Sequence, residues 1–256
     1  FPLMTDGYEE EIVVLAVLFC RISGCLLFAP GVSSPRIPVN VRLFLALAVT
    51  TALSPLLMNE ASLAISSFPD AQRLRLIPSE IITGSLIGLV ARFFVLSLQF
   101  AVTTISNFIG MAGIPGIPLE EAETGSPLTT LVTTAAVTAI FVAGLDVELL
   151  KALIDSYAVM PIGSFATPGV VASTLVGGLN ETWLLALRLS GPFLLYGVIV
   201  NFALGLANRF AQQISVYQTT TGLVMLGGLL LLSLVWFDWM ALFIENYRSW
   251  LVNGGF

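Results

Sequence analysis

The sequence predicts an all-α integral membrane protein with about six long hydrophobic helices arranged as helical hairpins. Its 256 residues are 57% hydrophobic and only 10% charged, whereas a soluble domain of this size carries about 25% charged residues. The mean hydropathy is +0.96, and the apolar residues gather in runs close to the roughly 20 residues that cross a bilayer. Helices are the conformation that satisfies the backbone of such runs in lipid.

Six apolar runs are the predicted membrane helices. They cover residues 12–29, 41–58, 81–109, 128–145, 183–207 and 223–244. A polar link at residues 66–78 precedes the third run, for which Ser79 is the predicted N-cap and Glu80 a favourable first-turn carboxylate. After the fourth run, the sequence predicts an amphipathic segment; its apolar face consists of Val147, Leu150, Ile154 and Tyr157.

The composition excludes several functional classes. The chain has no histidine, which excludes Ser-His-Asp and Cys-His catalysis and HExxH zinc sites. The net charge of −6 argues against a nucleic-acid partner. Cys20 and Cys25 point to different faces of one predicted helix, so we expect no disulfide. Acidic residues stand where a basic n-region would be, so we expect no secretory signal. We predict no catalytic residue, no cofactor and no metal site.

Three arginines, Arg21, Arg92 and Arg188, lie well inside the apolar runs. An arginine that faces acyl chains costs about 2.5–3.5 kcal/mol at a helix centre, so we expect each guanidinium to face protein or water. Two interpretations stay open: each arginine pairs with a carboxylate of a neighbouring helix, or it contacts a partner subunit. The candidate carboxylates within the runs are chiefly Asp146 and Asp238. These are too few for three arginines, which indicates a larger assembly.

The segment 110–127 is the strongest local signal, because its density of glycine and proline cannot continue a helix. One interpretation is an ordinary loop between helices. The other is a segment that fills a pore, since irregular backbone at membrane depth is tolerated where protein or an aqueous cavity surrounds it. The predicted plug residues are Gly110, Met111, Gly113, Ile114, Pro115, Gly116, Ile117 and Pro118.

The segment 205–222 is unusually polar for a link between apolar runs. Its uncharged side chains include Gln212, Gln213 and Gln218. As a solvated turn it would be unremarkable, whereas along a helix these groups would line a wet channel. Both interpretations stay open.

The chain resembles the flagellar biosynthetic protein FliR family and its type III secretion homologues over nearly its whole length. The resemblance begins with the motifs at residues 19–24, 29–31 and 35–43, an ordered series of arginine, glycine and proline that includes Arg42. It continues at residues 147–163 and at Gly205-Leu206-Ala207-Asn208-Arg209. The chain departs from the family at Asp146, where histidine is common, at Gln212, where proline is common, and at Gly222.

The resemblance implies that residues 1–256 form one non-enzymatic subunit of the flagellar type III protein export gate. Such a subunit joins the FliP and FliQ families, with an FlhB-family subunit, in a helical, cone-like pore in the bacterial inner membrane, within the flagellar basal body. The pore passes unfolded exported proteins, and segment 110–127 matches the loop that helps close it. Arg21, Arg42, Arg92, Arg188 and Arg209 would position helices or subunits.

Two other functional classes remain as alternatives. A small-solute secondary transporter would have a discontinuous helix pair and ionisable groups at mid-membrane, for which Gly191-Pro192 and Arg188 are the support in this sequence. An intramembrane enzyme is the weaker alternative, because the chain lacks histidine and a Gly-x-Gly-Asp pattern and has few candidate bases.

Overall fold

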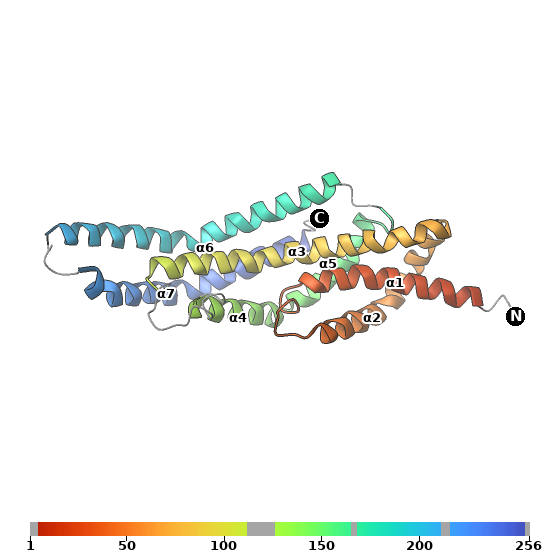
Figure 1. The fold of residues 1–256 in the computed structure, drawn as a ribbon, viewed down its shortest axis with the longest axis horizontal. Coiled ribbons are helices and arrows are strands. Elements are labelled where there is room, and N and C mark those ends of the chain that lie inside the picture. The colour runs from red at the N-terminus through yellow and green to blue at the C-terminus, as the bar shows by residue number, and fades with distance from the viewer. Residues whose placement is uncertain (1–4, 112–125, 165–167, 211–215, 254–256) are drawn as a thin grey trace. The chain divides into compact units, whose positions relative to one another are not determined.

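The computed structural model describes residues 5–111, 126–164, 168–210 and 216–253, and these residues form helices without any strand. The helices are α1 (Thr5–Phe28), α2 (Val39–Ser66), α3 (Asp70–Phe108), α4 (Pro127–Val142), α5 (Leu145–Val159), α6 (Pro168–Phe210) and α7 (Val216–Val252). Figure 1 shows these helices, coloured from red at the N-terminus to blue at the C-terminus. This confirms the predicted all-α class.

The predicted apolar runs 41–58, 183–207 and 223–244 lie within the longer helices α2, α6 and α7. The runs 12–29 and 81–109 each extend one residue past the end of α1 and α3. The run 128–145 covers most of α4 and the break at Ala143 and Gly144 that separates α4 from α5, so the fourth predicted helix is not continuous. Among the described residues, five helices are long and apolar enough to cross a membrane, namely α1, α2, α3, α6 and α7, and there is a sixth span if α4 and α5 form one span together. This agrees with the predicted membrane-type architecture of about six long apolar helices.

The predicted polar link at residues 66–78 is wrong, and so is the N-cap at Ser79. Helix α3 already begins at Asp70 and contains Pro78, which leaves Ser67–Pro69 between α2 and α3. A proline removes one helical hydrogen bond, to the carbonyl group four residues earlier. The carbonyl group that loses its hydrogen bond belongs to Leu74. Leu74 and Pro78 are both exposed, so this carbonyl group is not buried in the core.

The predicted amphipathic segment forms α5, but its buried face coincides only partly with the predicted apolar face: Tyr157 is buried and Ile154 packs against the core. Val147 is exposed, and the buried residues are Leu145, Leu149, Ala152, Leu153, Ser156 and Tyr157. These residues follow the spacing of three and four that defines one helical stripe. Leu149 and Leu153 belong to this stripe because they are apolar and lie four residues apart. Ser156 belongs to it because its hydroxyl oxygen accepts a hydrogen bond from the buried Arg21 guanidinium.

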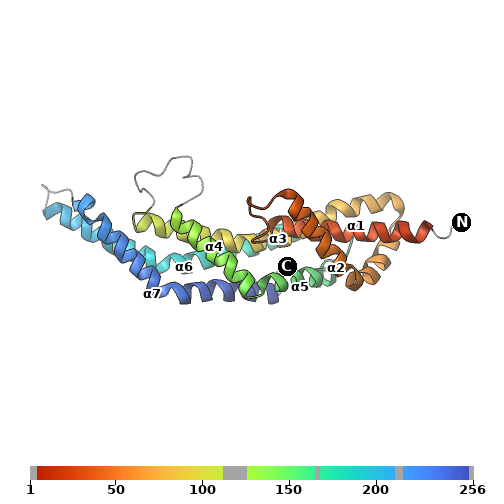
Figure 2. The same ribbon diagram turned by 90° about the horizontal axis from the view of Figure 1, so that it is seen from below.

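The chain divides into two compact units. Unit 1 consists of Phe1–Phe93, Gly144–Asn180 and Arg248–Phe256, and unit 2 of Phe94–Ala143 and Glu181–Tyr247. Helix α1 lies alongside the first part of α3 in both views (Figures 1 and 2). The core of unit 1 joins α1, α2, α3 and α5; it contains Val14, Leu18, Leu57, Ile65, Leu76 and Tyr157.

The α1–α3 contact in unit 1 is a close approach of two backbones. A Cβ atom added to Gly84 would collide with the carbonyl oxygen of Arg21, and one added to Gly88 with that of Cys25. A Cβ atom on Gly24 would lie 2.7 Å from the carbonyl oxygen of Ile81. Small residues four apart, as at Gly84 and Gly88, allow such close packing between membrane helices.

Unit 2 packs the second part of α3 with α4, α6 and α7. The Tyr196 hydroxyl of α6 donates a hydrogen bond to the Val224 carbonyl of α7 at 2.7 Å. The indole Nε1–H of Trp239 on α7 donates to the Leu189 carbonyl of α6 at 2.9 Å. Each aromatic residue thus satisfies its polar group inside an apolar helix pair, as buried Tyr and Trp require.

Candidate functional site

Arg21 on α1 is one of the largest fully buried side chains of the protein. Its Nε donates to Glu80 Oε2 at 2.5 Å, its Nη1 to Ser156 Oγ at 3.3 Å and its Nη2 to the Met160 carbonyl oxygen at 2.9 Å. The guanidinium carbon lies 4.0 Å from the centroid of the Tyr157 ring. All three guanidinium nitrogens therefore have a partner inside the protein.

Glu80 completes this group of residues from α3. Its carboxylate is buried, and its second oxygen accepts a hydrogen bond from the backbone N–H of Gly163 at 3.4 Å. We call the set Arg21, Glu80, Ser156, Met160 and Gly163 the Arg21 network. It joins α1 and α3 to the end of α5 and to the residues that follow it. The positive charge beside the Met160 carbonyl, at the C-cap of α5, suits the negative end of that helix.

The local sequence explains why Arg21 meets Glu80. Glu80, Gly84 and Gly88 recur every four residues and so lie on one face of α3. The two glycines bring the backbone of α1 against this face, and Glu80, one turn earlier, then reaches the Arg21 side chain. The carboxylates predicted for the arginines, Asp146 and Asp238, do not pair with Arg21. The signal that could have identified Glu80 is its position four residues before the small-xxx-small pair.

The structure places the other predicted arginines differently. Arg42 is half-buried, and its Nη2 donates to the Ser34 carbonyl at 2.6 Å across the link between α1 and α2, while its buried Nε has no hydrogen-bond partner. Arg92 is half-buried, and Arg188 and Arg209 are exposed. Among the described residues, Arg92 and Arg188 have no ion-pair partner. Arg209 lies in the last turn of α6, where a cation is favourable.

The predicted plug segment is described only at its two ends. Gly110, at φ 78°, ends α3 in a Schellman motif: its N–H donates to the Asn107 carbonyl at 3.3 Å and the Met111 N–H to the Ser106 carbonyl at 2.8 Å. Gly113, Ile114, Pro115, Gly116, Ile117 and Pro118 lie outside the described residues, as do Gln212 and Gln213. Gln218 lies in α7.

The far end of the segment is fixed to the near end. Ser126 is the N-cap of α4: its Oγ accepts from the Thr129 N–H at 3.2 Å, and Pro127 occupies the first helical position. The Ser126 hydroxyl also lies 2.8 Å from the Ser106 hydroxyl in the last turn of α3. Residues 112–125 are therefore held between two capped helix ends that contact each other.

Among the described residues, no group of three or more Cys, Asp or Glu side chains is arranged to hold a metal ion. The two cysteines are free thiols and form no disulfide, as predicted from their spacing.

The comparison with known proteins gives the family. Residues 12–249 match the profile of the family "Bacterial export proteins, family 1". The chain is 23% identical over 243 residues to the flagellar biosynthetic protein FliR of Caulobacter vibrioides. The aligned region covers 94% of this chain and 95% of that protein. It is 26% identical over 231 residues to FliR of Aquifex aeolicus, with 88% and 86% covered.

The similarity extends to a protein whose name states a different role. The chain is 27% identical over 222 residues to the Yop proteins translocation protein T of Yersinia pestis. The aligned region covers 84% of this chain and 82% of that protein. The family profile covers nearly the whole chain, including the Arg21 network, both ends of segment 112–125 and all but the ends of the long apolar helices. The chain therefore belongs to family 1 of the bacterial export proteins.

Proposed function

We propose that this protein is a non-enzymatic subunit of a flagellar type III protein export gate in the bacterial inner membrane, within the flagellar basal body. It helps to form and close the pore through which unfolded proteins pass. Its partners are subunits of the FliP, FliQ and FlhB families. Its relatives support this proposal, since two are named as flagellar biosynthetic proteins and one as a translocation protein.

The observation that carries the closing role is the anchoring of segment 112–125. The Schellman motif at Gly110 ends α3, and the N-cap at Ser126 begins α4. The Ser106–Ser126 contact holds these two helix ends together. These contacts hold the end of α3 and the start of α4 in place independently of the residues between them. The sequence of the segment is rich in glycine, proline and small apolar residues, which suits a yielding stopper.

Deletion of residues 112–117 tests this role in the assembled gate. We expect the deletion to leave assembly intact, because the capped ends remain, and to raise the permeability of the membrane to ions and small molecules. Some protein export should persist. Single-channel conductance of the purified gate and dye uptake by cells that make the whole gate are the two measurements.

A variant of unchanged length separates plugging from loop shortening. Ile114→Ser with Ile117→Ser keeps the segment length and removes two of its three large apolar side chains, so it should leak as the deletion does. The control is Phe141→Ser, which changes an exposed apolar residue of α4. A deletion that assembles normally and conducts no more than the parent would show that this segment is only a loop.

A further inference from the structure

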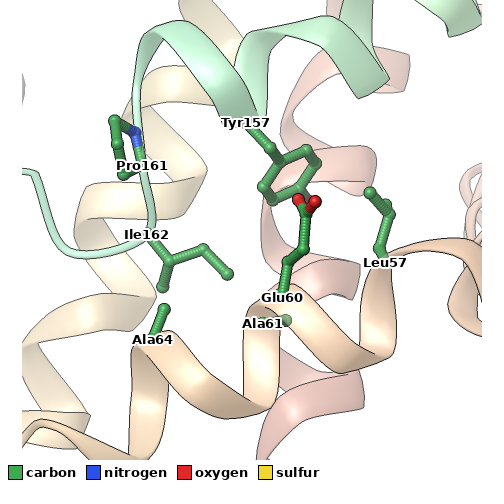
Figure 3. A pocket seen from close by; sticks show the side chains of 7 residues that line it. All are labelled: Leu57, Glu60, Ala61, Ala64, Tyr157, Pro161 and Ile162. Atoms are coloured by element: carbon green, nitrogen blue, oxygen red, sulfur yellow. The ribbon is translucent and has the colours of Figure 1, made fainter.

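A cavity of about 150 Å³ lies in unit 1 between α2, α5 and the residues that follow α5. Its walls are apolar and consist of Leu57, Ala61, Ala64 and Ile162, with the ring of Tyr157. Glu60 on α2 also lines it, and Figure 3 shows its carboxylate reaching toward the Tyr157 ring. The Tyr157 ring also contacts Arg21, but neither Arg21 nor Glu80 lines the cavity, so the cavity is a separate feature of this unit.

Glu60 has no cationic partner among the residues that the structure describes. It is exposed on α2, a helix apolar and long enough to cross a membrane. No basic group of the described residues lies within ion-pair distance of it. A carboxylate on such a helix is unfavourable against lipid tails unless a partner neutralises it. We therefore expect the Glu60 carboxylate to pair with a cationic group of another molecule.

The Tyr157 hydroxyl is the second group without a partner. Tyr157 is more than nine-tenths buried, and its hydroxyl oxygen is buried without a hydrogen-bond partner. Buried polar groups are nearly always hydrogen-bonded, and an orphan one costs about 1–3 kcal/mol. The cavity thus has apolar walls and one carboxylate. The hydroxyl of Tyr157, whose ring lines the cavity, has no hydrogen-bond partner among the described residues.

We propose that this cavity binds the side chain of a lysine from a neighbouring subunit. A cavity of this size holds a group about as large as benzene, which suits the four-carbon stem of lysine with its ammonium group. The stem would pack on Leu57, Ala61 and Ala64. The ammonium group would donate to the two carboxylate oxygens of Glu60, and its third N–H would reach the Tyr157 hydroxyl once that ring turns toward the cavity, because the hydroxyl oxygen itself is buried in this structure. Arginine fits less well, because its five donors would exceed these acceptors.

The lysine must come from another chain. Lys151 is the single lysine of this sequence, and its Nζ already pairs with Glu148 on the same helix at 2.8 Å. This inference rests on the proposed function in one respect, since it requires that the chain works as a subunit beside other proteins.

Carbodiimide coupling tests the inference on the whole complex, purified from membranes with its partner subunits. The reagent activates the Glu60 carboxylate, and an adjacent lysine amine then forms an amide with it. Mass spectrometry should find the Glu60 peptide joined to a lysine peptide of another protein. Glu60→Gln should abolish this link. The matched control is Glu245→Gln, which changes an exposed carboxylate in unit 2 and should leave the link unchanged.

A second measurement does not depend on the reagent. In Glu60→Gln, the amount of partner that co-purifies per copy of this chain should fall about fivefold, as expected for the loss of roughly one kcal/mol. Tyr157→Phe keeps the ring and should cause a smaller loss. Glu60→Lys combined with exchange of the linked lysine for glutamate should restore recovery.

The outcomes separate this inference from the proposed function. An intact complex in which Glu60 is only hydrolysed, links to Lys151 or links to the amine of phosphatidylethanolamine would overturn the lysine contact and leave the proposed function standing. Purification of the chain without any partner subunit would overturn both.

Discussion

At the scale of single residues, the Arg21–Glu80 pair determines whether unit 1 can pack. Both side chains are buried, so each charge has exchanged its water shell for the other charge and for the polar groups of the network. Loss of one member of a buried pair leaves the other charge uncompensated, which costs more than the pair contributes. The value of this pair is therefore in specifying how α1, α3 and α5 meet.

A single and a double substitution test this reasoning. Arg21→Met should destabilise the protein by about 3–5 kcal/mol, because Glu80 stays buried without its cation. Arg21→Met with Glu80→Leu should recover most of that loss. The measurement is the free energy of unfolding in mild detergent. A double variant as unstable as the single one would contradict the explanation, since the loss would then come from packing and not from charge.

Arg92 gives a second prediction at this scale. It is half-buried and has no ion-pair partner among the described residues, so we expect a partner subunit to contact it. Arg92→Leu should leave membrane insertion unchanged and reduce the amount of partner subunit that co-purifies at equal expression. Better insertion with normal assembly would mean that Arg92 faces lipid.

The sequence could predict that an arginine in an apolar run needs a partner, but not which partner. The sequence predicts that the Arg21 guanidinium faces protein or water, and the three groups that it hydrogen-bonds lie 59, 135 and 139 residues away in the chain. Glu80 was assigned to the first turn of a helix because Pro78 looked like a helix boundary. Only the tertiary contact at Gly84 and Gly88 shows that Glu80 faces α1.

At the scale of helices, the α1–α3 contact depends on glycine. Gly84→Ala should destabilise unit 1, because its Cβ would collide with the backbone of Arg21 and a backbone cannot rotate away. Overpacking of this kind costs about 1–3 kcal/mol. The matched control is Gly177→Ala, also within a helix of unit 1 but with nothing within 4 Å of the added Cβ. It should stabilise the protein by up to about 1 kcal/mol.

Thermal unfolding of the two variants in the same detergent gives the comparison. The prediction fails if Gly84→Ala unfolds at the parent temperature, since α1 and α3 would then be free to separate without loss. It also fails if both alanine variants shift by the same amount and in the same direction, because the effect would then be one of helix propensity.

Helix centres could be predicted from the sequence, whereas helix ends and buried faces could not. The runs at 41–58 and 223–244 lie inside α2 and α7 because hydrophobic length depends on composition alone. The start of α3 was missed because a proline inside a helix resembles a proline that ends one. The buried face of α5 depends on Arg21 and Glu80, which lie far away in the sequence, so local periodicity could not determine it.

At the scale of the whole molecule, many large apolar side chains are exposed. Phe44, Phe202, Phe210 and Phe237 are each at least 70% exposed. Soluble monomers rarely expose contiguous apolar patches beyond a few hundred Å². Lipid tails could cover these side chains, but they would not suit Glu60, Arg92 or Arg188. A surface that combines the two kinds of group fits contact with other subunits as well as lipid.

The last prediction concerns assembly. We expect the chain to aggregate when it is purified alone and to be monodisperse when it is co-expressed with its partner subunits. A partner at 100 times its dissociation constant adds about 2.7 kcal/mol of stability, and each kcal/mol raises Tm by about 2–4 °C in a chain of 150–250 residues. Assembly should therefore raise Tm by roughly 5–10 °C.

Size-exclusion chromatography and thermal unfolding, each with and without the partners, measure this difference. The physical reason is that partner helices remove apolar side chains and unpaired charges from the detergent boundary at the same time, which neither detergent nor lipid does alone. A chain that is monodisperse without partners and unfolds at the same Tm as the complex would show that its polar groups need no other subunit.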